Sequence, residues 1–84
     1  MPTVFNQNGF RFFFYSDEMS GLQLEPVHIH VKKERKEAKF WVSPVSLAYN
    51  EGYSRSDLQD IERLVIENAG LIQEKWDEHF KGIK

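Results

Sequence analysis

The sequence predicts an α+β fold, in which a small antiparallel sheet of β-hairpins carries a long C-terminal helix packed on one face. Three observations lead to this prediction. The first half of the chain holds short β-prone runs, Asn8-Gly9 separates the first two of them, and the second half carries apolar residues at helical spacing. With 84 residues the chain allows one small core, so we expect a single domain over residues 1–84.

Two strands are predicted on either side of Asn8-Gly9, over residues 3–6 and 10–15. Asn-Gly is typical of two-residue hairpin turns, because both of its residues adopt positive φ at low cost. The strand over residues 10–15 has aromatic side chains on both faces. One helix covers only one face of a small sheet, so we expect another element or another chain to cover the second face.

A second hairpin is predicted from residues 27–33 and 37–42, which both alternate between apolar and polar side chains. A two-residue turn at Glu34-Arg35 pairs residues whose numbers sum to 69, so that Ile29 lies beside Phe40. A slip of one residue would move every apolar side chain to the wrong face, which makes this register specific. We expect three or four strands in the sheet. The side chains expected to face the helix are Val27, Ile29, Val31, Ala38 and Phe40.

Residues 44–49 are predicted to be a short extended or helical link, followed by a turn over residues 50–52. The long helix is predicted over about residues 55–81, because Ser54 is a typical N-cap and Asp57 lies in the first turn. An apolar stripe with a mean spacing of about 3.67 residues continues this helix. The stripe consists of Leu58, Ile61, Val65, Ala69, Ile72, Trp76 and Phe80.

Two residues bear on the continuity of this helix. Gly70 lies on the face opposite the stripe. It lowers the stability of the helix by about 1 kcal/mol relative to alanine, but the stripe stays in phase across it. We expect one helix that bends at Gly70, and two helices that meet there are the alternative. Asn68 falls inside the stripe, and we interpret it either as a hydrogen-bonded side chain of the helix or as a contact to a partner.

The composition excludes several classes of protein. The absence of cysteine excludes a disulfide framework, a zinc ribbon and a thiol nucleophile. The net charge is −2, with a local +3 over residues 32–39 and a local −5 over residues 57–78, so the chain as a whole is not a basic nucleic-acid binder. No apolar run is long enough for a transmembrane helix and no signal peptide is visible, so we expect a cytoplasmic protein with no membrane partner.

The candidate catalytic residues are His28 and His30, which alternation places on one strand face, about 6–7 Å apart. Histidine titrates near neutral pH, which suits the pair to act as general acid and base. Lys39 and Trp41 join that face from the next strand, and we expect Arg11 or Tyr15 to join it from the other side. Cations and aromatic rings on an open sheet face suit contacts with the phosphates and bases of nucleic acid, so Lys39, Trp41 and Arg11 are candidate binding residues.

The same histidine spacing suits two ligands of one metal ion. Glu18, Asp17 or Glu25 then supplies a carboxylate as the third ligand. The sequence requires no cofactor, so a divalent metal bound by His28 and His30 is an alternative to acid–base chemistry. A further alternative is that both histidines face solvent, or stack on Trp41, and have no chemical role.

An ordered series of short motifs runs through nearly the whole chain. The motifs include Met1-Pro2-Thr3-Val4-Phe5, Gly9-Phe10-Arg11-Phe12, Glu25-Pro26-Val27-His28-Ile29-His30-Val31, Glu37-Ala38-Lys39-Phe40-Trp41, Asn50-x-Gly52-Tyr53 and Ile72-x-x-x-Trp76. In combination they resemble the family of small bacterial proteins called domain of unknown function 4160. The resemblance implies a stand-alone bacterial protein, often paired with a protein of domain of unknown function 2442 in the manner of a toxin–antitoxin module.

We therefore expect a small bacterial protein that acts through protein interaction, as a member of a toxin–antitoxin-like two-gene module. Its expected partners are a small protein, a second copy of the chain, or both. The first alternative is a small ribonuclease or nucleic-acid-binding toxin that uses His28 and His30, with Lys39 holding a phosphate. The second alternative is a metal-binding module with a His-x-His site.

Overall fold

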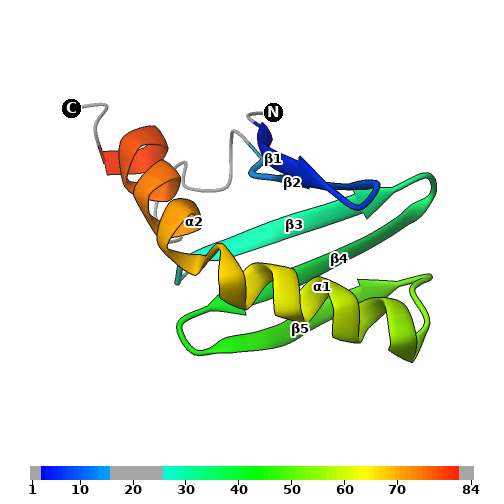
Figure 1. Ribbon diagram of the computed structural model, residues 1–84. Helices are drawn as coiled ribbons and strands as arrows, with labels where there is room; N and C mark the ends of the chain where they lie inside the picture. The colour runs from blue at the N-terminus through cyan, green and yellow to red at the C-terminus, as the bar shows by residue number, and fades with distance from the viewer. Residues whose placement is uncertain (1–2, 16–25, 82–84) are drawn as a thin grey trace.

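The computed structural model describes residues 3–15 and 26–81. Within them, the strands form one five-stranded antiparallel sheet in the order β1-β2-β3-β4-β5, so each strand pairs with its neighbour in sequence. Helices lie on one face of the sheet, which confirms the α+β class (Figure 1). The elements are β1 (Thr3–Gln7), β2 (Phe10–Phe13), β3 (His28–Lys33), β4 (Lys36–Val42), β5 (Val45–Glu51), α1 (Arg55–Glu67), α2 (Ala69–Trp76) and the π-helical turn η1 (Asp77–Lys81).

Both predicted hairpins form. Asn8 and Gly9 connect β1 to β2 with φ angles of 55° and 83°, the positive values that this turn requires. In the second hairpin Ile29 pairs with Phe40, which confirms the register of β3 against β4. Glu34 has a φ of 58° in its turn, a conformation more typical of glycine.

The sheet has one strand more than predicted. Residues 45–49 of the segment expected to be a link, and residues 50 and 51 of the expected turn, belong to β5, which pairs with β4 along its whole length. β5 is an edge strand, and of its residues only Val45 is partly buried. The sequence of β5 therefore lacks the alternation of apolar and polar residues that would predict a strand. Pairing with β4 determines its structure.

Each of the two edge strands contains a β-bulge. In β1, Thr3 and Phe5 pair with consecutive residues of β2, so Val4 is the extra residue. In β5, Leu47 and Tyr49 pair with consecutive residues of β4, so Ala48 is the extra residue. A bulge reverses the local alternation of side chains, which allows Val4 and Phe5 both to pack against the core although they are adjacent in sequence.

The prediction of one long helix over residues 55–81 is wrong. The helical region divides at Asn68, two residues before the predicted position at Gly70, into the short helices α1 and α2. Asn68 has φ −110° and ψ 16°, and both its backbone N–H and its Nδ2 donate to the carbonyl oxygen of Leu64, at 3.0 and 2.8 Å. The side chain of Asn68 is thus bonded to its own helix where α1 ends, as in the first interpretation.

The core lies between the sheet and the helices. Ile29 and Phe40 are 0% and 1% exposed, which confirms that the predicted face of the second hairpin packs against the helices. Ser54 caps α1 by accepting a hydrogen bond at 3.1 Å from the backbone N–H of Asp57, so the predicted start of the helix is also confirmed. The buried apolar side chains of the helices are Ile61, Leu64, Val65, Ile72 and Trp76. Among the described residues, no helix is long and apolar enough to cross a membrane.

Tyr53 joins the start of α1 to the sheet. Its ring is buried edge-on against Phe10, with 5.9 Å between ring centres. Its hydroxyl lies 3.3 Å from the carbonyl oxygen of Val31 and 3.2 Å from that of Lys36, and it donates to these acceptors at the ends of β3 and β4. Burial raises the pKa of Tyr53 to about 12, with a smaller contribution from the negative charge of Asp57.

We predict that Tyr53 makes the folded chain sensitive to alkali. Because its pKa rises from 10.0 to about 12 on folding, the folded state keeps a proton that the unfolded chain loses. The stability from this hydroxyl is complete below pH 10 and is lost between about pH 10 and pH 12. Urea unfolding across this range should give a steep loss of stability in the wild type and a shallower loss in Tyr53→Phe, which should also lose about 1 kcal/mol at pH 7.

Tyr49→Phe is the matched control. Tyr49 is exposed, and its pKa is raised by the hydrogen bond that its hydroxyl donates to Glu51 at 2.6 Å. Because Tyr49 is exposed and solvent screens its interaction, this variant should flatten the alkaline loss less than Tyr53→Phe does. An equally steep loss in Tyr53→Phe would contradict the prediction.

Candidate functional site

The register of the second hairpin brings four of the predicted site residues together. His28 pairs with Trp41 and His30 pairs with Lys39, on the sheet face opposite Ile29. Arg11 lies on the same face but pairs with Lys32, four residues along β3 from His28. Arg11 therefore lies away from His28, but its guanidinium lies over Phe13, whose ring centre is 5.7 Å from that of His30.

The expectation of an open face is wrong at the two histidines. His28 is 0% exposed and His30 is 8% exposed. The ring of His28 makes edge contacts with Trp41, Trp76 and His30, with ring centres 5.7, 5.0 and 5.3 Å apart. Its Nδ1 lies 2.9 Å from the carbonyl oxygen of Pro26, which can only accept, so Nδ1 carries the hydrogen.

The contact between His28 and Trp76 depends on the break between the helices. α2 lies beside the end of the sheet at which β3 begins, and it leads away from α1 in a different direction (Figure 1). The apolar stripe predicts Trp76 as a core residue, and it is 2% exposed. The stripe does not predict that Trp76 contacts His28 on the opposite sheet face, because this contact depends on where α2 ends.

His30 belongs to a polar group with Tyr15 and Glu37, of which Glu37 was not among the predicted site residues. The hydroxyl of Tyr15 donates to Glu37 Oε2 at 2.7 Å, and His30 Nδ1 lies 3.7 Å from the same oxygen. The rings of Tyr15 and His30 are nearly perpendicular, with centres 4.5 Å apart. A carboxylate next to one imidazole nitrogen is an arrangement that suits general acid–base chemistry. The alternation of β4 places Glu37 on this face and was the signal that could have identified it.

The predicted cationic residues lie over aromatic rings. Lys39 Nζ is 4.6 Å from the ring centre of Trp41, and the guanidinium carbon of Arg11 is 4.7 Å from that of Phe13. Phe13 is buried, so side chains of this chain cover the second face of β2 at this position. These contacts stabilise the cations against the sheet by about 0.5–1 kcal/mol each.

The metal alternative lacks a described third ligand. Asp17, Glu18 and Glu25 lie outside the described residues. Within residues 3–15 and 26–81, no three side chains of the metal-ligating types histidine, cysteine, aspartate and glutamate gather at one point.

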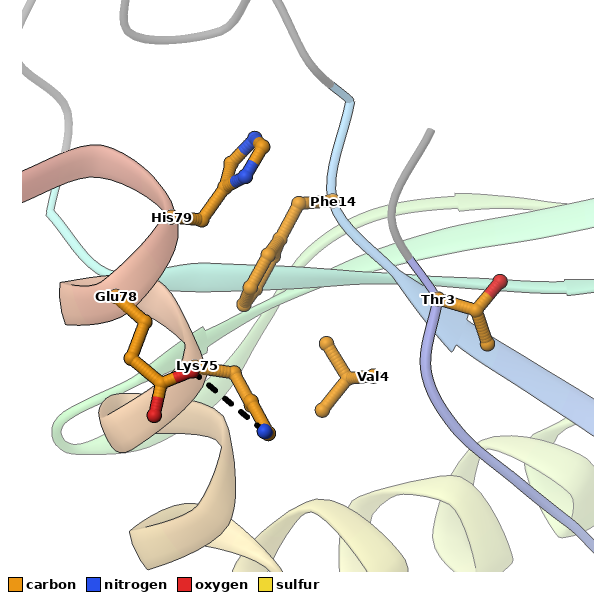
Figure 2. A pocket seen from close by; sticks show the side chains of 6 residues that line it. All are labelled: Thr3, Val4, Phe14, Lys75, Glu78 and His79. Atoms are coloured by element: carbon orange, nitrogen blue, oxygen red, sulfur yellow. Dashed lines mark ion pairs between the residues drawn. The ribbon is translucent and has the colours of Figure 1, made fainter. Parts of the chain in front are cut away.

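A hollow of about 280 Å³ lies beside Phe14 (Figure 2). Its lining comes from β1, from the residue that follows β2, from α2 and from η1: Thr3, Val4, Phe14, Lys75, Glu78 and His79. A continuous series of ring contacts connects this hollow to the buried histidines. It runs from His30 to His28, Trp76, Phe14 and His79, with successive ring centres 5.3, 5.0, 5.4 and 6.3 Å apart.

Comparison with known protein families gives a match over most of the chain. The model of the family described as Domain of unknown function (DUF4160) matches residues 9–77. The chain belongs to this family. A search of curated proteins finds no match, and a search of solved structures finds none either.

The DUF4160 match covers the two regions of the site to different extents. It contains the whole group around the buried histidines, which comprises Tyr15, His28, His30, Glu37, Trp41 and Trp76. Four of the residues that line the hollow lie outside the matched range, namely Thr3, Val4, Glu78 and His79. The family match therefore covers the histidine group more completely than the hollow.

We predict that His28 stabilises the fold. His28→Ala leaves a cavity among rings that are fixed by the sheet and α2, and it should lower the free energy of unfolding by about 2–4 kcal/mol. Lys32→Ala is the matched control, because Lys32 lies exposed on the same strand and face, and this variant should change stability by less than about 0.5 kcal/mol. Urea unfolding at neutral pH measures both, and equal stability of the two variants would contradict a structural role for His28.

Proposed function

We propose that the DUF4160 chain is a cytoplasmic protein-interaction domain, and that it acts as one member of a toxin–antitoxin-like two-gene module. The observation that carries this proposal is the distribution of exposed apolar side chains. Leu47, Tyr49 and Ile66, the exposed large hydrophobic residues among those described, are 44%, 50% and 56% exposed, and all three belong to β5 or α1. We call these three residues the β5–α1 surface.

The β5–α1 surface suits a partner that wraps around the edge of the sheet. Leu47 pairs with Phe40 on the helix side of the sheet, and Tyr49 pairs with Lys39 on the opposite side. A partner that covers both side chains must therefore contact both faces at this edge. The bulge at Ala48 makes the strand edge irregular, which favours side-chain packing over the addition of a regular strand.

The charge of the helices indicates the chemistry of the partner. Glu62 and Glu67 are exposed on α1 near Ile66 in sequence, and residues 57–78 carry a net −5. Exposed carboxylates around an apolar side chain favour a partner with basic side chains around an apolar centre. We propose the protein encoded beside this chain as that partner, in accordance with the pairing that the family resemblance implies.

Leu47→Ser and Ile66→Ser test the proposed surface. Both residues are exposed, so the variants should keep the wild-type stability within about 0.5 kcal/mol. Each should weaken the complex with the neighbouring gene product at least about tenfold, which corresponds to about 1.4 kcal/mol of binding free energy. Calorimetry on the purified pair measures the affinity, and growth of cells that express the chain with and without its neighbour measures the function.

The control for this experiment is Gln7→Ser on the opposite edge of the sheet. Gln7 is exposed on β1, far from β5 in the strand order, so this variant should bind as the wild type does. Wild-type affinity in both Leu47→Ser and Ile66→Ser, or the absence of any complex, would contradict the proposal.

A second candidate function is that of a small ribonuclease or nucleic-acid-binding toxin, and the group of His30, Glu37 and Tyr15 favours it. In this proposal Glu37 orients His30, and the imidazole exchanges a proton with the RNA 2′-hydroxyl group, while Lys39 contacts a phosphate. His28 is less suited to this role than the sequence predicts, because it is fully buried and its Nδ1 bonds to a carbonyl oxygen.

His30→Gln and Glu37→Gln distinguish the two candidate functions. If His30 is a catalytic residue, both variants should lose RNA cleavage and any growth phenotype that depends on it by about 100-fold or more. Lys32→Gln, on the same face, is the matched control and should keep both. A growth phenotype that persists in folded His30→Gln would exclude the ribonuclease and leave the interaction function.

A further inference from the structure

We propose that Tyr15 is a gate over His30, and that this gate is closed in the structure. The gate is a contact within the chain. The hydroxyl of Tyr15 occupies an oxygen atom of Glu37 that His30 also faces, and the ring of Tyr15 covers the imidazole. The contact itself is independent of the functions inferred above, whereas its effect on catalysis rests on the second candidate function.

One oxygen atom of Glu37 faces two side chains. The hydroxyl of Tyr15 donates to Oε2 at 2.7 Å, and His30 Nδ1 lies 3.7 Å from the same atom. A hydrogen bond from a nitrogen to an oxygen spans about 2.7–3.2 Å, so His30 Nδ1 is too far from Oε2 to donate to it. A catalytic base is commonly oriented by a hydrogen bond to a third group. Tyr15 therefore holds the oxygen that would orient His30.

The ring of Tyr15 also covers the imidazole. The two rings meet at 75° with their centres 4.5 Å apart, closer than the rings of His28 and Phe13, which lie 5.3 and 5.7 Å from His30. Among these rings His30 is 8% exposed. A group that exchanges a proton with an imidazole has to come within about 2.6–3.2 Å of a ring nitrogen. Such an approach to His30 requires a covering ring to move.

Of the three rings, that of Tyr15 is the best placed to move. Phe13 lies in β2 and His28 in β3, and both side chains are 0% exposed. Tyr15 is partly exposed and follows the end of β2. A hydrogen bond to an ionised carboxylate is about twice as strong as one between neutral groups. The bond from Tyr15 to Glu37 therefore holds the ring over His30.

A single movement of Tyr15 would change both features of the site. It would free Oε2 of Glu37 to accept a hydrogen bond from His30, and it would uncover the imidazole for a ligand. In the second candidate function, RNA cleavage therefore requires the open position of Tyr15. The closed position is then the inactive one, and any ligand that binds the open position shifts the population toward it.

Chemical modification of the three histidines measures the gate without reference to any activity. Diethyl pyrocarbonate acylates accessible imidazole nitrogens, and peptide mapping by tandem mass spectrometry reports each histidine separately. Tyr15→Phe keeps the ring and removes the hydroxyl, and at mildly alkaline pH it should raise the rate at His30 about tenfold. Tyr15→Ala removes both and should raise the rate further. His28 is 0% exposed and serves as the internal reference.

Tyr49→Phe is the matched control for the modification rate. Tyr49 also donates a hydroxyl hydrogen bond to a carboxylate, that of Glu51 at 2.6 Å, and it lies on the same sheet face as His30. This variant should leave the rate at His30 unchanged, and the dispersion of the NMR spectrum verifies that each variant is folded. An unchanged rate at His30 in folded Tyr15→Phe would overturn the proposal, because the hydroxyl would then not hold the gate.

RNA cleavage separates the gate from the second candidate function. If both are correct, Tyr15→Phe should cleave a single-stranded RNA about tenfold faster than the wild type. Slower cleavage by Tyr15→Phe would overturn the gate, because the hydroxyl would then assist the reaction. If neither form cleaves RNA, the ribonuclease candidate is wrong, and the modification rate at His30 alone decides whether Tyr15 is a gate.

Discussion

The register of β3 against β4 is the constraint on which the other features depend. A two-residue turn with Glu34 at positive φ places Ile29 beside Phe40, so that one face of both strands packs against the helices. The same register determines the position of Glu37 relative to His30 on the opposite face. If the pairing slipped by one residue, the carboxylate would move to the core side and the apolar residues of β4 would move to the histidine side.

The parts of the fold that the sequence predicts are those in which local pattern and tertiary contacts agree. The two hairpins have turn residues and alternation that favour the same register, and the capping residue of α1 lies at the predicted position. β5 was not predicted because an exposed edge strand has no buried face to impose alternation. The helix break lies at Asn68, where φ and ψ are −110° and 16°, and the apolar stripe does not predict it because the stripe stays in phase across this residue.

The sequence predicts which residues form the candidate site better than it predicts how deeply they are buried. Alternation brings His28, His30, Lys39 and Trp41 to one face, as expected. Their burial was not predictable, because the ring that covers His28 comes from α2 and reaches it only after the helices separate at Asn68. Trp76 therefore contacts the core of the helix side and a histidine of the opposite face at the same time, and it connects the two regions of the site.

The bulges of the edge strands have a consequence for the behaviour of the chain at high concentration. A five-stranded sheet with two regular edges offers a template on which further copies can polymerise into cross-β fibrils. Here Val4 interrupts one edge and Ala48 interrupts the other, so neither presents a long regular row of backbone donors and acceptors. We therefore expect the two bulges to disfavour the addition of further copies at either edge of the sheet.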